Sequence, residues 1–369
     1  MVENIYLRMM VVVMSDIDWK DFQIGGKEGF FSIKSSISEI DKKNLNDEVG
    51  ETPYVTRTDL NNGISMYVTK NQDKKYIPNK GNVISIGLDT QTIFYQPTEF
   101  YTGQNIQILS HEKMNEDIAR YLIPLLKIQL SKFSWGGNGA TLKRLNNSRI
   151  MLPINEKDEL HWEYMEEQGK ALYDRKHNDI LKYLRKKQLE LKTQLSKINE
   201  PIIKEIAWKT FEVEEMFGVK RVSGEPLNKY DEGNLPFIST SSQKNGVQGF
   251  VNSKKEDVSP KNSLTISPID GTIFFHSYNF VGRGRAGSSI STMTNENLNK
   301  YNGLFIKTMI EASSKHKASY GVQLNGKRLK STKFYLPVAD DNEPDWQFME
   351  NYMKQIEYEK LTKIINYLS

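Results

Sequence analysis

The sequence has no cysteine and no long run of apolar residues. The first absence excludes disulfides and every metal site built on thiolates. The apolar run near the N-terminus, "MMVVVM" at Met9–Met14, is far too short to span a bilayer, and "SDIDW" follows it where a cleavage site would need small residues. We interpret this run as a core strand, as an arm, or as the product of a start codon placed upstream of the native one. A cytoplasmic location is the expectation.

A large charge excess is also missing. The chain carries 50 basic and 46 acidic residues, for a net charge of +4. This balance excludes a histone-like polycation, but it leaves room for one basic face if the acids lie elsewhere.

Catalytic signatures are absent as well. There is no H-E-x-x-H, no G-x-S-x-G elbow, no P-loop lysine motif and no Asn-Pro-Pro-aromatic segment. The "ELK" at Glu190–Lys192 matches half of a nuclease pattern, but it lies in a charged helical segment without strands around it. The histidines, none at metal-ligand spacing from another, are His111, His161, His177, His276 and His316. We therefore predict a non-catalytic chain with no metal site; turnover of DNA by the purified chain would revive the alternative of an unrecognised enzyme.

One motif imitates a nucleotide site. "GRGRAG" at Gly282–Gly287 satisfies G-x-G-x-x-G, but the dinucleotide fold needs a helix directly after it, and "SSISTMTNEN" is a poor helix former. We interpret it either as a basic loop that offers Arg283 and Arg285 to phosphates or guanine edges, or as a solvated turn.

What the sequence does contain is an internal duplication. "TPYVTRTDLNNGISMYV" at Thr52–Val68 aligns without a gap with "LPFISTSSQKNGVQGFV" at Leu235–Val251, an offset of 183 residues. Further pairs follow in the same order, at offsets of 180 to 189: "WKDF" with "WKTF", "TIFY" with "TIFF", "KRL" with "KRL", "LPI" with "LPV" and "HWEYME" with "DWQFME". Such a long period indicates two tandem domains, for which 369 residues suffice.

Each half is expected to be α+β, strand-rich with at least one helix. Short β-branched and aromatic runs such as "NVISIGL", "TIFYQ", "SLTIS" and "GTIFFH" predict strands. "NEDIARYLIPLLKIQLSKF" and "NLNKYNGLFIKTMIEASSK" have helical apolar spacing, and Pro124 is expected to kink the first of them. The predicted divisions are an arm at 1–18, a first domain at 19–155, a helical spacer at 156–207, a second domain at 208–340 and a C-terminal helix at 341–369.

Both charged segments carry an apolar seam. In the first the seam is Met165, Leu172, Ile180, Leu184, Leu191, Leu195 and Ile198, and in the second it is Met349, Met353, Ile356, Leu361, Ile364 and Leu368. This spacing predicts that the two helices pair as an antiparallel coiled coil. Because the first is longer, part of its seam would stay uncovered, and a second copy, another protein or aromatic side chains of the domains would cover it.

The turns of both halves are rich in side chains that read bases and phosphates. Arginine and lysine suit guanine, and asparagine and glutamine suit adenine. The Asn62-Gly63 and Asn245-Gly246 pairs are interpreted as mainly structural turns, so the residues just before them are the better readers. A second basic loop, "SWGGNGATLKRL" against "SYGVQLNGKRL", offers an aromatic residue and phosphate-neutralising cations, unless these only bond the domain's own acids. The candidate DNA-contacting residues are Arg57, Asn61, Asn62, Trp135, Asn138, Lys143, Arg144, Ser241, Gln243, Lys244, Asn245, Arg283, Arg285, Tyr320, Asn325, Lys327 and Arg328.

These features together resemble a known family, the DNA specificity subunits of type I restriction–modification systems and the related target-recognition subunits of type IIB and IIG enzymes. The resemblance runs from Trp19 onward and rests on the "WKxF" entries, the "PFIS...NGVQGFV" hairpin, "GTIFF", "YGVQLNGKRL" and the "LPV...PDWQFMENYM" exit. The first half departs from the pattern, with "HWEYME" at the exit and Ala140-Thr141-Leu142 in place of "LNG".

The resemblance implies two target recognition domains, each reading half of a split DNA site, with helices that set the gap and dock a methyltransferase. S-adenosylmethionine and Mg²⁺ would then belong to partner subunits, and this chain would hold no cofactor. Self-association through the spacer helices is a further expectation. The alternative is a stand-alone binding protein, such as a phage-borne decoy that captures a host methyltransferase or DNA.

Overall fold

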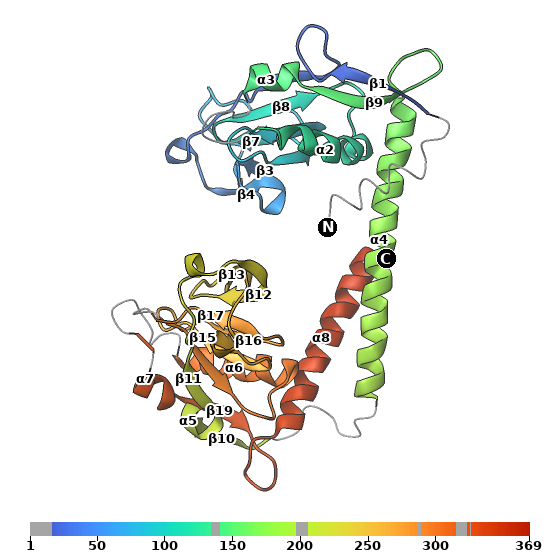
Figure 1. The fold of residues 1–369 in the computed structure, drawn as a ribbon. Coiled ribbons are helices and arrows are strands. Elements are labelled where there is room, and N and C mark those ends of the chain that lie inside the picture. Colours follow the sequence, from blue (N-terminus) through green and yellow to red (C-terminus); the bar gives the residue numbers. More distant parts are fainter. Residues whose placement is uncertain (1–16, 134–140, 197–205, 286–288, 315–322, 325) are drawn as a thin grey trace. The chain divides into compact units, whose positions relative to one another are not determined.

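The computed structural model describes residues 17–133, 141–196, 206–285, 289–314, 323–324 and 326–369 (Figure 1). Two compact units divide the chain, one up to Ile180 and one from Leu181 onward. We call them the first and the second unit. The interpretation of Met9–Met14 concerns residues outside the described part.

The first unit is built on a four-stranded antiparallel sheet in the order β2-β8-β5-β6. These strands span Ser32–Ser35, Ile106–Ser110, Val83–Gly87 and Ile93–Gln96, respectively. A smaller sheet has the order β4-β3-β7, with strands at Ile64–Val68, Val49–Val55 and Tyr101–Thr102. The ribbon of β1 (Asp18–Gln23) and β9 (Arg149–Ile154) brings the two ends of this domain together.

Helix α2 (Glu116–Leu130) contributes to the core of the first unit. Asn115 caps it by accepting a 2.9 Å hydrogen bond from the Ile118 N–H, and two acids stand in its first turn. Its buried positions recur at helical spacing, with Ile118, Leu122 and Leu126 in the same core cluster as strand β5. The helix continues through Pro124.

The second unit repeats this plan. Its larger sheet has the order β11-β18-β15-β16, with strands at Gly218–Arg221, Ser291–Thr294, Ser263–Ile266 and Ile273–His276. Its smaller sheet has the order β13-β12-β17-β14, at Val247–Val251, Glu232–Ile238, Phe280–Gly282 and Val258–Ser259. The ribbon of β10 (Trp208–Glu212) and β19 (Lys333–Pro337) and helix α6 (Lys300–Ser314) stand where β1, β9 and α2 stand in the first unit. The predicted α+β fold and internal duplication are therefore confirmed.

Both units also contain short helices between these elements. The first unit has η1 (Lys42–Asn44), η2 (Asn61–Gly63) and α3 (Leu142–Asn147). The second has α5 (Val213–Met216), η3 (Leu227–Lys229), η4 (Lys244–Gly246), η5 (Lys255–Asp257) and α7 (Gly326–Lys330).

The long helices begin later than the charged segments suggest. Helix α4 spans Trp162–Leu195, about 51 Å, and α8 spans Trp346–Leu368. Before α4, the Asn155–Asp158 turn places Asp158 at a φ of 62°, and Leu160 bridges back to Ile154, so the chain cannot yet be helical. Asp345 caps α8 with a 2.8 Å hydrogen bond from the Phe348 N–H.

Within the second unit, the last turns of α4 contact α8. Gln188 donates a 2.7 Å hydrogen bond to Thr362, Lys187 forms an ion pair with Glu357, and Arg185 donates to the Ser369 hydroxyl at 3.1 Å. Knobs-into-holes packing, which the coiled-coil interpretation requires, stays a prediction.

In each long helix, one predicted seam residue is exposed and its neighbour in the sequence is buried instead. Leu181 and Leu191 of α4 are buried, whereas Ile180 is 51% exposed. In α8, Ile365 is buried and Ile364 is 46% exposed. The positions 181, 184, 188, 191 and 195 alternate in steps of three and four, so Gln188 occupies a seam position that an apolar pattern does not reveal.

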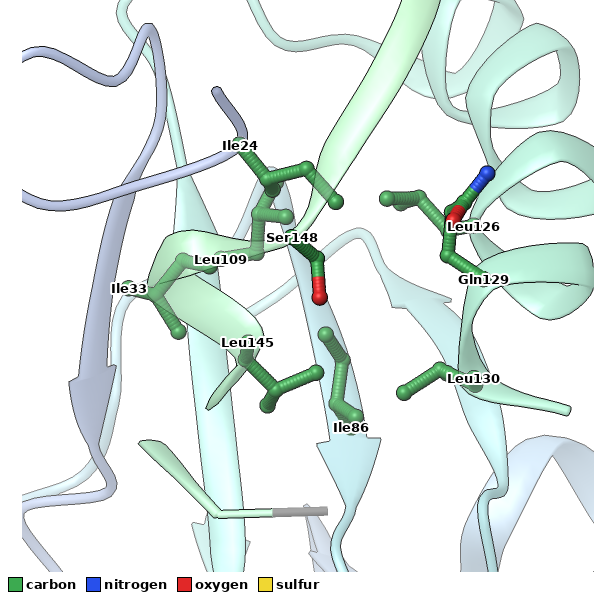
Figure 2. Close-up of a pocket in the computed structure, with 9 residues that line it drawn as sticks. All are labelled: Ile24, Ile33, Ile86, Leu109, Leu126, Gln129, Leu130, Leu145 and Ser148. Carbon is green, nitrogen blue, oxygen red and sulfur yellow. The ribbon is translucent and has the colours of Figure 1, made fainter. Parts of the chain in front are cut away.

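A small cavity of about 10 Å³ lies in the core of the first unit (Figure 2). The side chains around it come from the central sheet, α2, α3 and the residues that directly follow β1 and α3: Ile24, Ile33, Ile86, Leu109, Leu126, Gln129, Leu130, Leu145 and Ser148. A space of this size holds at most one water molecule. It is a packing gap and offers no room for a ligand.

Candidate nucleic-acid interface

Each unit presents one loop on its smaller sheet, between β3 and β4 and between β12 and β13. The loop closes through backbone atoms: Thr56 N–H donates to the Gly63 carbonyl at 2.8 Å, and Ser239 N–H donates to the Gly246 carbonyl at 2.9 Å. Asn62 and Asn245 have left-handed backbones, with φ of 57° and 55°. The loops are therefore wider than a two-residue Asn-Gly hairpin, and the Asn-Gly pair forms only their last turn.

The two asparagine side chains point back into the domain. Asn62 donates a 2.8 Å hydrogen bond to the Tyr95 carbonyl. Asn245 Nδ2 lies 3.4 Å from the Phe275 carbonyl and 3.2 Å from the Tyr278 hydroxyl. These contacts fix the loop on β6 and β16, in agreement with the structural interpretation of both Asn-Gly pairs.

A buried polar side chain supports each loop from below. In the first unit Gln96 donates to the Asn62 carbonyl at 3.1 Å and to the Ser85 hydroxyl at 3.0 Å. In the second unit the same strand position is His276, whose Nδ1 lies 3.5 Å from Nδ2 of the loop residue Asn245 and whose Nε2 lies 2.8 Å from the Thr265 hydroxyl. We call Gln96 and His276 the loop supports.

The histidine support is held neutral. His276 is fully buried, and this burial lowers its pKa to about 4. Neither support was predicted as a functional residue. The alignment of "TIFYQ" with "TIFFH" contains the signal, because a polar residue ends an otherwise apolar strand in both halves.

The loop residues before the Asn-Gly pairs differ in how freely they can reach DNA. Asn61, Gln243 and Lys244 are exposed, and Ser241 is half-buried, with its hydroxyl accepting a 3.2 Å hydrogen bond from the Gln243 N–H. Arg57 forms an ion pair with Asp89. A DNA contact by Arg57 would have to compete with that carboxylate.

The second set of predicted contacts lies on helices. Lys143 and Arg144 belong to α3, which Thr141 caps, and Lys327 and Arg328 belong to α7. The expected basic loop is therefore wrong for these four residues, because burial of Leu145 and Leu329 anchors a helical turn at each place. All four side chains are exposed.

The structure does not bring the two sets together. The loop turn η2 contacts β6, whereas α3 contacts β2, and these strands are the two edges of the central sheet. At about 4.8 Å per strand, the edges lie roughly 14 Å apart. Figure 1 shows α3 and β4 at opposite ends of the first unit, and α7 likewise stands apart from β13. Trp135, Asn138, Tyr320 and Asn325 lie outside the described residues.

The "GRGRAG" stretch is not a nucleotide-binding loop, and its two arginines have different surroundings. Strand β17 ends inside it, and β18 follows at Ser291, so the helix that a dinucleotide site needs is not there. Arg285 forms an ion pair with Glu225. Arg283 is half-buried beside the loop, with its N–H donating to the Ile238 carbonyl at 2.8 Å.

A comparison with protein families shows which family the two repeated domains belong to. The model described as the type I restriction modification DNA specificity domain matches residues 17–197 and again 205–367. The chain belongs to this family. The two matches reproduce the two repeats and confirm the predicted resemblance.

Individual relatives are also specificity subunits. The specificity subunit S.BcgI of a type II restriction enzyme from Heyndrickxia coagulans is 29% identical over 321 residues, which cover 83% of this chain and 86% of that protein. A crystal structure of a type I restriction–modification S subunit from M. genitalium covers 96% of this chain and 94% of its own, with 15% identity and a TM-score of 0.46. That of the HsdS subunit from Thermoanaerobacter tengcongensis covers 95% and 90%, with 14% identity and a TM-score of 0.31.

Family membership decides the general role of the chain. It is a DNA specificity subunit of a restriction–modification system, and such subunits are non-catalytic, which confirms the prediction that the chain is not an enzyme. Specificity subunits bind DNA and assemble with methyltransferase subunits. Within the described ranges, no three histidine or acidic side chains gather as a metal site. Every helix in those ranges is too short or too polar to span a bilayer.

Proposed function

We propose that each target recognition domain reads one half of a split DNA site, through the loop on its smaller sheet. The proposal rests mainly on one observation: the same frame is built twice, while the exposed residues of the two loops differ. Asn61 in the first unit corresponds to Lys244 in the second. Two domains with the same fold but different exposed loop residues are suited to recognising two different DNA sequences.

Energetics favours two short readers over one. A mismatched base pair costs about 1–3 kcal/mol, so two half-sites of a few pairs give strong discrimination, whereas phosphate contacts carry no sequence information. The exposed cations of α3, at the other edge of the sheet in the first unit, and those of α7 in the second unit suit the phosphate role.

The long helices would set the gap between the half-sites and dock the methyltransferase. A helix holds a spacing better than a flexible loop. In this proposal the readers occupy residues 19–155 and 208–340, and S-adenosylmethionine and Mg²⁺ belong to partner subunits. The exposed Ile180, Tyr183 and Leu189 of α4 support a protein contact there, either with a methyltransferase or with a second copy.

Methylome sequencing tests the proposal. The chain would be co-expressed with its methyltransferase subunit in a host that lacks methylation systems. We expect methylation at a motif of two short half-sites separated by a fixed gap. A single continuous motif, or no motif from an assembled complex, would contradict the proposal. Stable capture of a foreign methyltransferase with loss of its methylation would instead favour the decoy alternative.

A further inference from the structure

The second unit has an open groove beside its recognition loop. It measures about 380 Å³ and lies where η3, β12, β13 and the end of β17 meet. Its lining combines apolar and polar side chains: Pro226, Leu227, Asn228, Phe237, Gln248 and Arg283. Asn228 and Gln248 are exposed, whereas Phe237 is fully buried, so the groove has an apolar base and a polar rim.

The wall of this groove is held in place without any ligand. Tyr230 accepts a 2.7 Å hydrogen bond from the Glu225 N–H and donates one of 3.0 Å to Asp257. Its ring packs on Phe237, with centroids 6.0 Å apart. An ion pair with Arg285 holds the Glu225 side chain, directly before the lining residue Pro226. A preformed wall costs less ordering on binding.

Arg283 differs from Arg285 in what holds it. Backbone hydrogen bonds fix the main chain of Arg283, whereas an ion pair with Glu225 holds the guanidinium of Arg285. Its N–H donates to Ile238 at 2.8 Å, and its carbonyl accepts from the Ile290 N–H at 3.2 Å. Among the residues that the structure describes, no carboxylate forms an ion pair with Arg283. Its guanidinium therefore lines the groove with its donors available.

The first unit lacks this arrangement at the equivalent place. Gly103 occupies the position of Arg283, since its N–H donates to Val55 at 2.9 Å as Arg283 does to Ile238. Tyr54 stands where Phe237 does, and its hydroxyl, which donates to the Ile40 carbonyl at 2.7 Å, would lie 3.2 Å from a Cβ at residue 103. At this position the first unit thus has a glycine beside a buried tyrosine, whereas the second unit has an arginine beside a phenylalanine.

We propose that Arg283 is a specificity-determining residue that reads the guanine of one G·C pair in the half-site bound by the second unit. A guanidinium offers two parallel donors, which match the O6 and N7 acceptors of guanine in the major groove. Asn228 and Gln248 flank it and can accept or donate at neighbouring base edges. This inference rests on the proposed function and adds a base and a residue to it.

The test uses the complete complex with its methyltransferase and compares three variants. Arg283→Ala removes the donors, and Arg283→Lys keeps the charge but loses the planar fork. Lys229→Ala removes an equal charge from an exposed residue next to the groove wall without changing its lining. Each complex is tested by selection from a pooled DNA library and by titration at several salt concentrations, and its melting temperature is measured.

We expect Arg283→Ala to lose roughly 5- to 150-fold of its preference for G·C at one position of one half-site, with the other half-site unchanged. Arg283→Lys should lose most of that preference while melting like the wild type, which covers the case in which the alanine variant does not fold. Lys229→Ala should keep the complete motif.

Two results would overturn the inference. An unchanged motif in both Arg283 variants would show that this side chain reads no base. Uniform weakening at all sites, with the salt slope reduced by about one, would assign Arg283 to a phosphate instead. If the wild-type complex selects no two-part motif, the proposed function itself fails, and the role of Arg283 fails with it.

Discussion

The Asn115 side chain donates a 2.8 Å hydrogen bond to the carboxylate of Glu166, which joins the start of α2 to α4. The second unit has the same link 184 residues later, where Asn299 donates to Glu350 at 2.7 Å. Both asparagines also accept hydrogen bonds from backbone N–H groups at a helix start. One residue type thus caps an internal helix and fastens the long exit helix to its domain.

Loss of this link should destabilise the first unit. Asn115→Ala removes the cap and the contact to Glu166, so we expect the free energy of unfolding to fall by about 1–2 kcal/mol. Urea denaturation followed by circular dichroism measures it. Glu112→Ala, at an exposed position of the preceding turn, serves as the control and should stay within about 0.5 kcal/mol of the wild type.

The histidine loop support predicts a pH dependence confined to the second unit. Burial lowers the pKa of His276 to about 4, below its ordinary value near 6.5, so the unfolded chain binds the proton more readily than the folded one. The contribution to stability is complete above about pH 6.5 and is lost as the pH falls toward 4, at most roughly 3 kcal/mol in total. Hydrogen exchange of amides in β15 and β16 should report this loss.

His276→Gln, which places the residue type of Gln96 in the second unit, should remove most of that pH dependence. Amides of β5 and β6 in the first unit provide the internal comparison. Equal acid sensitivity of β16 in the variant and the wild type would show that the histidine is not its source.

A side chain at either left-handed glycine of the loops should destabilise the loop. Gly63 and Gly246 have φ of 78° and 76°, and a Cβ there would lie 3.1 Å from Phe94 and from Ile238, respectively. Gly63→Ala and Gly246→Ala should each cost about 1–2 kcal/mol and weaken recognition of one half-site only, a different one for each variant. Gly249→Ala is the matched control, since its Cβ would only touch Leu227 at 3.6 Å. Half-site binding assays distinguish these outcomes, and equal weakening of both half-sites by either loop variant would contradict the assignment.

Two leucines of α4 test the seam. Leu191 is buried, and Leu189, two residues earlier, is 64% exposed. Leu191→Ala should lower the free energy of unfolding by about 2–4 kcal/mol, whereas Leu189→Ala should change it by less than about 0.5 kcal/mol. Thermal unfolding of both variants decides the matter; similar losses would mean that the face bearing Leu189 is covered as well.

The repeated frame could be predicted from the sequence because short-range patterns determine it. Runs such as "NVISIGL" and "GTIFFH" became β5 and β16, and the aligned Asn-Gly pairs adopt the same left-handed turn. The pairing order of the strands could not be predicted, since it depends on contacts between segments far apart in the chain.

The errors have local physical causes. The predicted seam of α4 includes Ile180, but its neighbour Leu181 is the buried residue, and both have the same apolar character and similar spacing from Leu184. Gln188 is missing from the predicted seam because it is polar and pairs with Thr362. The helical state of the Lys-Arg-Leu triplets depends on burial of Leu145 and Leu329, which the glycine-rich sequence around them conceals. The different roles of Arg283 and Arg285 depend on Glu225, which pairs with Arg285 from 60 residues away in the sequence. A contact over such a sequence distance cannot be predicted from the local pattern.

Closure of each loop through Thr56–Gly63 and Ser239–Gly246 has a consequence for how new sequence preferences can arise. The bonds that hold the loop use backbone atoms, Asn62 or Asn245, and a buried support, so the residues in between contribute little to folding. If each loop reads one half-site, as proposed, substitutions at those intervening positions would alter recognition at small cost to stability, and one half would change while the other keeps its target. The chain would then acquire new specificities one half-site at a time, in nature or in a randomised library.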